Sequence, residues 1–273
     1  IPPSNALITY SLASGGTSVA ALFMAGYVPG IIWALACAVV GVILAKKLGY
    51  KGTPGKFDWK NLGVCTLRAL PSLSLIIVVI GGIVGGVFSA TEGSAIAVVY
   101  ALFVEVFITR SMTRKLFFEI IKSSVRINAA IFLVVASATA LGQIMMYYNL
   151  SAAVLDTIMG ISTNKVVIMA LILVVLLILG TFLEAAAIIM IVTPLLLPVI
   201  NAIGVDPVHF GIIMLTSFAV GGQTPPVGMT LFVGASIAKI SIERLSIASI
   251  PYILTLVVML VINRVFRMNE SVY

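Results

Sequence analysis

Charged residues are scarce in this sequence of 273 residues. Lysine and arginine together number 16 and aspartate and glutamate nine, so charged residues make up 9% of the chain and hydrophobic residues 61%. Soluble domains carry about 25% charged residues. The first charge, Lys46, follows 45 uncharged residues. Because about 20 apolar residues span a bilayer, the sequence predicts an all-α polytopic membrane protein and excludes a soluble enzyme.

Cysteine and histidine are scarcer still. The two cysteines, Cys37 and Cys65, have no CxxC spacing, and the single histidine, His209, sits beside Asp206 and Pro207 at an expected helix start, where a cap or interface residue is commoner than a catalyst. This spacing supports neither a disulfide framework nor a cysteine and histidine metal site. An intramembrane enzyme would need a nucleophile with its base, or a set of metal ligands. We therefore predict that the chain is not an enzyme and that it uses no organic cofactor.

The net charge of +7 is unevenly distributed along the chain. Eleven of the sixteen positive residues fall within two stretches between hydrophobic runs, Lys46–Arg68 and Arg110–Arg126. Such clusters are typical of the cytoplasmic loops of membrane proteins. Aromatic residues do not interleave with them as they do on nucleic-acid-binding surfaces. We therefore expect the lipid bilayer, and no nucleic acid, as the surroundings of this chain.

The charged and uncharged windows divide the chain into five parts. Residues 1–45 are expected to hold a half-helix from Ser4 to about Ser14 and then a spanning helix, because Gly15-Gly16 interrupts the run. The later parts are a cytoplasmic basic loop at 46–68 with a turn at 52–55 and Trp59 as an interfacial anchor, two scaffold spans at 69–108, an amphipathic interfacial helix at 109–126, and the transport part of a second repeat at 127–273.

The turn between the two scaffold spans is predicted from a short motif. Ser89-Ala90-Thr91-Glu92 has the spacing of a capping box, in which Ser and Glu side chains satisfy backbone N–H groups at a helix start. We therefore expect one span to end before Ser89 and the next to begin directly after it.

A run of forty residues, Val166–Val205, contains one charge, Glu184. The run is too long for one span, so the chain either crosses the membrane twice or enters it and returns. We favour a re-entrant hairpin with Gly180–Glu184 at its tip, because a Gly-Thr break at mid-depth needs protein or water around it. The chain would then return to the side from which it started.

Two Pro-Pro pairs mark an internal repeat. Pro2-Pro3 and Pro225-Pro226 each precede a short uncharged segment, and a further proline follows 27 residues after Pro2 and 26 residues after Pro225. Weak internal symmetry of this kind is typical of transporters built from repeats. If the hairpin returns to the outer side, the two repeats are inverted; if the region crossed once, they would be parallel.

The helix breaks also predict chemistry. Half-helix ends leave backbone carbonyl groups that coordinate hard cations such as Na⁺. Gly180-Thr181, Gly221-Gly222 and Thr224 would supply carbonyl and hydroxyl oxygens, and Glu184 would lie beside them. The alternative interpretation is that these residues mark plain kinks and that Glu184 caps a helix of the hairpin.

Five motifs in this order carry a family resemblance: Ile1-Pro2-Pro3-Ser4, Gly86–Glu92, Leu179–Glu184, Asp206–Gly211, and Thr224–Gly228 followed by Leu231-Phe232-Val233. Over its whole length the chain resembles the large membrane subunit of tripartite ATP-independent periplasmic (TRAP) transporters. The resemblance implies a multi-pass protein of the bacterial inner membrane and a Na⁺-coupled secondary importer with an elevator mechanism and inverted repeats. It also implies two partners, a small four-helix membrane subunit and a periplasmic binding protein. The binding protein would deliver an organic acid, such as a C4-dicarboxylate or a sialic-acid-like carboxylate.

The resemblance also implies where ions and substrate bind. The residues expected at these sites are Pro2, Pro3, Ser4, Asn5, Gly180, Thr181, Glu184, Gly221, Gly222, Thr224, Pro225, Pro226 and Gly228. Na⁺ itself is expected at Gly180, Thr181, Glu184, Gly222, Thr224 and Pro226. Many members of the family carry Asp at the position of Glu184. The family's first hairpin is expected to precede Ile1, so the chain would correspond to the C-terminal two-thirds of such a subunit. It is not expected to transport alone.

Two other transport functions fit the same architecture. One is a dicarboxylate/Na⁺ symporter of the related elevator superfamily, which needs no binding protein. The other is a passive channel, which would show no substrate-dependent Na⁺ uptake. Genes for a binding protein and a small subunit beside this one would favour the tripartite system.

Overall fold

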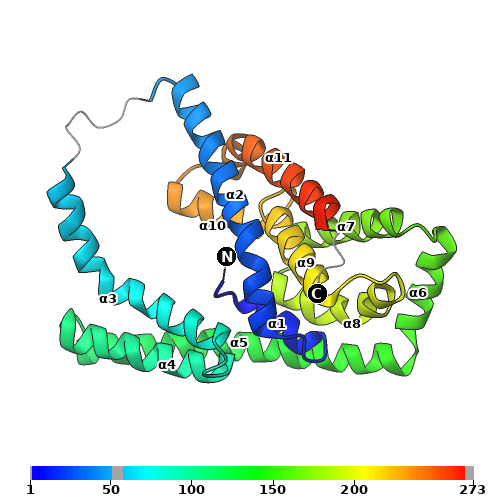
Figure 1. Ribbon diagram of the computed structural model, residues 1–273, viewed down its shortest axis with the longest axis horizontal. Helices are drawn as coiled ribbons and strands as arrows, with labels where there is room; N and C mark the ends of the chain where they lie inside the picture. The colour runs from blue at the N-terminus through cyan, green and yellow to red at the C-terminus, as the bar shows by residue number, and fades with distance from the viewer. Residues whose placement is uncertain (1, 51–57, 268–273) are drawn as a thin grey trace. The chain divides into compact units, whose positions relative to one another are not determined.

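The computed structural model describes residues 2–50 and 58–267, without the side chains of 262–267, and these residues form helices and no strands. Figure 1 labels the helices along the chain. They are α1 (Asn5–Ala13), α2 (Val19–Lys47), α3 (Trp59–Val84), α4 (Ala90–Phe103), the π-helical turn η1 (Val104–Ile108), α5 (Arg114–Tyr147), α6 (Leu150–Ile161), α7 (Lys165–Phe182), α8 (Ala185–Ala202), α9 (Pro207–Gly221), α10 (Met229–Ala238) and α11 (Ile242–Arg267). The predicted turn at 52–55, and Ile1 of the first motif, lie outside the described residues.

Seven helical segments of the described chain are long and apolar enough to cross a membrane. They are α2, α3, α4 together with η1, α5, α7, α8 and Ile242–Val261 of α11. This confirms the prediction of an all-α polytopic membrane protein at the level of helix length and composition.

The chain folds as two compact units. Unit 1 comprises Pro3–Leu44 and the chain from Val134 onward, and unit 2 comprises Ala45–Leu133 together with Pro2. In unit 1, α9 packs against both α7 and α8, α1 packs on α8 and α9, and α6 lies along α8. Together α1, α7, α8 and α9 enclose most of the buried core of unit 1.

Unit 2 is an antiparallel pair of helices followed by the first part of α5. The pair is joined by the predicted capping box: Ser89 Oγ accepts from Glu92 N at 3.3 Å, and Glu92 Oε2 accepts from Ser89 N at 2.7 Å. Farther along the pair, the Tyr100 hydroxyl of α4 donates to Pro71 O of α3 at 3.0 Å. The predicted turn between two spans is therefore present at Ser89.

The basic loop predicted at 46–68 is shorter than expected. Helix α3 begins at Trp59, because Asp58 caps it: Asp58 Oδ1 accepts from Lys60 N at 3.0 Å and from Asn61 N at 3.1 Å. Lys60 and Arg68 therefore lie in the first three turns of α3, and Lys46 and Lys47 are in the last turn of α2. The last helix, α11, begins at Ile242. It therefore includes Glu243 and Arg244, which precede the uncharged run that starts at Leu245.

The amphipathic helix predicted at 109–126 and the span predicted from 127 are one continuous helix, α5. It starts at Arg114, after Arg110 adopts a positive φ of 52°. No glycine or proline occurs between Arg114 and Leu141, so nothing in the sequence interrupts the helix where its hydropathy changes. A change from amphipathic to apolar pattern alone does not end a helix.

The two Pro-Pro pairs open similar pairs of helices. After Pro2-Pro3 come the nine-residue α1 and the long α2; after Pro225-Pro226 come the ten-residue α10 and the long α11. Each long helix contains a proline near the end of its first third, Pro29 in α2 and Pro251 in α11. The helix lengths therefore follow the repeat that the sequence predicts.

Candidate functional site

The break between α7 and α8 lies at the predicted hairpin tip. Helix α7 ends at Phe182, Leu183 is extended, and α8 begins at Ala185. Glu184 caps α8: its Oε2 accepts from Ala186 N at 2.9 Å and from Ala187 N at 3.2 Å. The capping role proposed for Glu184 as the alternative interpretation is thus present. The side chain is exposed, and its Oε1 accepts no hydrogen bond among the described residues.

The second break follows the end of α9 at Gly221. The chain turns through Thr224, whose N–H donates to Gly221 O at 2.8 Å, and continues through a cis Pro225-Pro226 peptide bond. Gly228, with a φ of 53°, then precedes α10. The backbone carbonyl of Gly222 is held by Thr230, through both its N–H and its hydroxyl.

The two breaks meet backbone to backbone. A Cβ placed on Gly221 would lie 2.7 Å from the carbonyl carbon of Gly180, and one on Gly180 would lie 3.2 Å from Phe218 Cα. The N–H of Gly228 donates to Thr181 O at 3.1 Å, which joins the second break directly to the hairpin. The structure therefore brings together Gly180, Thr181, Gly221 and Gly228.

The meeting point carries oxygen atoms suited to a monovalent cation. Both threonine hydroxyls donate to their own helices, Thr181 Oγ1 to Ile178 O and Thr224 Oγ1 to Val220 O, each at 2.7 Å. A hydroxyl that has donated its proton keeps lone pairs for a cation. Nowhere in residues 2–50 and 58–267 do three or more His, Cys, Asp or Glu side chains gather to hold a metal ion. Neutral carbonyl and hydroxyl oxygens of this kind can coordinate a hard cation.

The first Pro-Pro loop is not joined to this cluster by hydrogen bonds of the described residues. Pro2 is buried and Pro3 exposed, and Ser4 precedes α1 without a side-chain cap. Asn5 opens α1, and its carbonyl accepts from Thr9 Oγ1 at 3.0 Å. The contacts thus connect Gly180, Thr181, Gly221, Thr224 and Gly228, while Glu184 caps α8 and Pro2–Asn5 lie separately at the start of α1.

The far end of α1 is the part that is fixed to α9. The Tyr10 hydroxyl donates to Pro207 O at 2.6 Å, and its ring packs so close to Gly211 that a Cβ there would lie 2.6 Å from Tyr10 Cε1. Asp206 caps α9 by accepting from His209 N at 3.0 Å, as expected for a helix start at this motif. Helix α1 and the second break are therefore tied to the two ends of the same helix, α9.

Sequence reasoning missed two contact residues. Thr230 closes the second break on Gly222, and its place directly after the Thr224–Gly228 motif was a usable signal. Tyr10 has no such signal, because its partner Pro207 lies 197 residues away in the chain.

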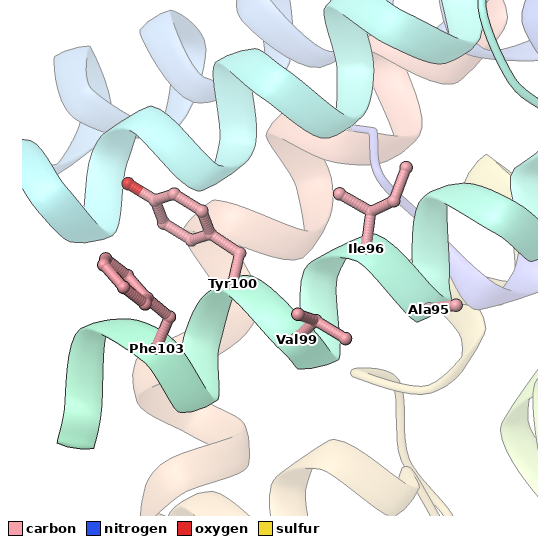
Figure 2. Close-up of a pocket in the computed structure, with 5 residues that line it drawn as sticks. All are labelled: Ala95, Ile96, Val99, Tyr100 and Phe103. Atoms are coloured by element: carbon pink, nitrogen blue, oxygen red, sulfur yellow. The ribbon is translucent and has the colours of Figure 1, made fainter. Parts of the chain in front are cut away.

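An apolar groove in unit 2 takes no part in this set. Figure 2 shows it along α4, lined by Ala95, Ile96, Val99, Tyr100 and Phe103. Its volume is about 440 Å³, and none of the predicted site residues lines it. The one polar group there, the Tyr100 hydroxyl, is engaged with Ser74 Oγ at 2.6 Å and with α3. None of the residues that line the groove has a free polar group that could bind an ion.

Comparison with known families decides what kind of protein carries these breaks. Residues 1–268 match the family described as "Tripartite ATP-independent periplasmic transporter, DctM component". The chain belongs to this DctM family. The resemblance to the large TRAP subunit is thereby confirmed, and with it the prediction of a transporter component rather than an enzyme.

Several curated relatives are similar over almost the whole of this DctM chain. A protein of Salmonella typhimurium with the name "Uncharacterized protein YgiK" is 43% identical over 95% of this chain and 59% of its own length. The "Isethionate TRAP transporter permease protein DctMQ" of Oleidesulfovibrio alaskensis is 37% identical over 96% of this chain and 41% of its own. The "Sialic acid TRAP transporter large permease protein SiaM" of Vibrio cholerae is 35% identical over 97% of this chain and 62% of its own. The chain thus spans about two fifths to three fifths of the length of these relatives.

Proposed function

We propose that this chain is part of the large membrane subunit of a Na⁺-coupled TRAP importer of small organic acids in the bacterial inner membrane. The family match supports the transporter assignment. The names of three relatives mention isethionate, sialic acid and C4-dicarboxylates, all of which are organic anions. By the same family membership, its partners are a small membrane subunit and a periplasmic binding protein that delivers the organic acid.

The observation that carries the proposal is the meeting of two helix breaks at Gly180, Thr181, Gly221 and Gly228. At the two breaks Thr181 O accepts one hydrogen bond, from Gly228 N, and Gly221 O accepts one, from Thr224 N. A carbonyl oxygen has two lone pairs, so the second lone pair of each can coordinate a cation. Gly180, Thr181, Gly221 and Gly228 are buried where α7 packs against α9, so their oxygens are shielded from water. A cation bound there would hold the hairpin against the second Pro-Pro loop, at Pro225-Pro226. Ion binding would then be linked to the conformation of both the hairpin and this loop.

The hairpin has two legs, α7 and α8, and this even number supports the inverted repeat and with it an elevator mechanism. The base of the hairpin is closed by Lys165, whose Nζ donates to Gly204 O at 3.1 Å. The start of α7 and the end of α8 therefore lie side by side, and the chain leaves the hairpin on the side where it entered. With both basic stretches in the cytoplasm, the two Pro-Pro units then run in opposite directions through the membrane.

Glu184 has two separable roles in this proposal: its Oε2 caps α8, and its free Oε1 and negative charge favour the cation. Glu184→Gln retains a carbonyl oxygen for the cap but removes the charge. We expect this variant to raise the Na⁺ concentration for half-maximal uptake by roughly tenfold, which corresponds to about 1.4 kcal/mol, with little change in stability. Glu184→Ala removes both roles and should in addition lower the melting temperature. Unchanged Na⁺ dependence in Glu184→Gln would leave Glu184 as a cap only.

The proposal is tested with the complete permease and its small subunit in proteoliposomes. Uptake of labelled sialic acid, a labelled C4-dicarboxylate and labelled isethionate is measured with and without an inward Na⁺ gradient, each with and without the binding protein encoded beside the permease gene. We expect one of these acids to enter only when both the gradient and the binding protein are present. Uptake with the gradient alone would place the chain among symporters that need no binding protein. Uptake that is indifferent to Na⁺ would contradict the coupling.

A further inference from the structure

Helix α8 contains a carbonyl group that its own helix cannot satisfy. In an α-helix the carbonyl of residue i accepts from the N–H of residue i+4. The partner of Pro194 O would be the N–H of residue 198, and residue 198 is itself a proline, which has none. In a membrane an unpaired backbone carbonyl is costly, because no water is available to replace the lost bond.

Ser151 supplies the missing donor from the neighbouring helix. Its Oγ lies 3.2 Å from Pro194 O and donates to it, across 43 residues of sequence. Ser151 stands at the second position of α6, and Ile158, seven residues later and on the same face, is 8% exposed. Helix α6 therefore lies along α8 with one polar anchor at its start and an apolar contact two turns farther on.

A tight elbow lies directly before Ser151, at the same end of α6. Helix α5 ends at Tyr147 and α6 begins at Leu150, so two residues turn the chain from one helix into the next. Asn149 achieves this with a φ of 51° and a ψ of 33°, in the left-handed region. Its side chain makes no cap on α6, so the elbow is held by the local backbone bonds around Asn149 and not by the α8 contact.

We propose that Ser151 is a positioning residue that fixes α6 to the hairpin helix α8, so that α6 moves with the hairpin. Any displacement of the hairpin relative to α5 is then taken up at Tyr148–Asn149. The transport part of this inference rests on the proposed function; the bond between Ser151 and Pro194 O does not.

A double-mutant cycle tests the bond itself, by thermal unfolding of the complete permease in detergent. Ser151→Ala leaves Pro194 O unpaired, and we expect a fall in melting temperature of roughly 2–4 °C. In a Pro198→Ala background, residue 198 regains an N–H for Pro194 O, so the additional effect of Ser151→Ala should vanish. Thr157→Ala is the matched control, because Thr157 Oγ1 donates within α6 to Ala153 O and is exposed. Equal falls for Ser151→Ala in both backgrounds, or for Ser151→Ala and Thr157→Ala, would overturn the bond.

A crosslink tests the movement. With Cys37 and Cys65 replaced by serine, Ser151→Cys and Pro194→Cys are joined by an oxidant in proteoliposomes and uptake is measured before and after reduction. Whatever rate the reduced double-cysteine permease shows, we expect the crosslinked permease to show at least the same Na⁺-driven uptake, because α6 and α8 do not separate. Loss of uptake on oxidation with recovery on reduction would show that they do, and would overturn the inference.

The kinetics of Ser151 variants give a third measurement. Ser151→Ala should lower the maximal uptake rate severalfold with little change in the half-saturating substrate concentration, and Ser151→Thr, which keeps the hydroxyl, should restore the rate. If the unmodified permease shows no Na⁺-driven uptake at all, the proposed function fails while the melting-temperature cycle still decides the bond. A rate unchanged in Ser151→Ala would contradict the positioning role.

Discussion

The hairpin helices of unit 1 and the helix pair of unit 2 are buried to different degrees. In the apolar windows of α7 and α8, 39% and 33% of the residues are buried, against 11% in α3 and 11% in α4 with η1. Helices α2 and α11 of unit 1 are about as exposed as the pair in unit 2, with 6% and 11% buried. All twelve of the largest fully buried side chains among the described residues lie in unit 1. In unit 2 the helices α3 and α4 expose most of their apolar side chains, as helices that face lipid or another subunit do.

The difference indicates where a membrane protein can interrupt its helices. The two breaks of the candidate site follow Phe182 at the end of α7 and Gly221 at the end of α9. These two helices pack on each other, and α9 is also covered by α1, α8 and α11. In its described residues unit 2 interrupts its helices after Lys47, at Ser89 and between η1 and α5, and at Ser89 a capping box satisfies the backbone. Backbone groups freed at mid-depth need protein around them, so helix breaks and burial occur together.

The largest expected effect in this comparison is at Gly221. Gly221→Ala would place a Cβ 2.7 Å from the carbonyl carbon and 2.8 Å from the Cα of Gly180, and neither backbone atom can move without separating α7 from α9. We expect a loss of about 3 kcal/mol, at the upper end of overpacking effects, together with loss of uptake. Gly142→Ala is the control: Gly142 lies inside α5 with open space around it. Because Ala is preferred to Gly in a helix by about 1 kcal/mol, this variant should melt at the same or a higher temperature. Similar melting temperatures for the two variants would contradict the close approach.

A smaller effect is expected at Gly82 in unit 2, although its nominal overlap is greater. A Cβ on Gly82 would lie 1.9 Å from Phe88 Cζ, but that atom is the end of a side chain on a partly exposed turn. The ring can rotate away, so we expect Gly82→Ala to lose about 1 kcal/mol or less. The same thermal unfolding assay applies. In a Phe88→Ala background the substitution should become neutral or stabilising. A loss in that background as large as that of Gly221→Ala would mean that unit 2 is packed as rigidly as unit 1.

Much of the fold and part of the site could be predicted from the sequence, for local reasons. The helix breaks at Gly15-Gly16, Ser89, Leu183-Glu184 and Gly222–Gly228 each carry their own turn or capping residues. The length of α5 could not be read from hydropathy, because the pattern changes near residue 126 while helix-forming residues continue. Contacts between distant segments gave no signal: Gly180 on Gly221, Tyr10 on Pro207 O and Ser151 on Pro194 O each depend on how two helices cross. The sequence shows where the glycines and prolines are. It does not show which backbone segment of another helix each of them contacts.

The smallest expected effect concerns the capping box of unit 2. Ser89→Ala removes the acceptor for Glu92 N, and Glu92 Oε2 loses the Ser89 hydroxyl but keeps the Ser89 N–H at 2.7 Å. Loss of an N-cap serine lowers stability by about 1 kcal/mol. The matched control is Ser94→Ala, because the Ser94 hydroxyl only donates back to Thr91 O within the same helix. If unit 2 relies on local bonds, amide exchange in Ser89→Ala should accelerate over the first turn of α4 and remain unchanged in α7–α9. Faster exchange in α7–α9 would instead show that the start of α4 supports the buried core, and the contrast between the two units would no longer hold.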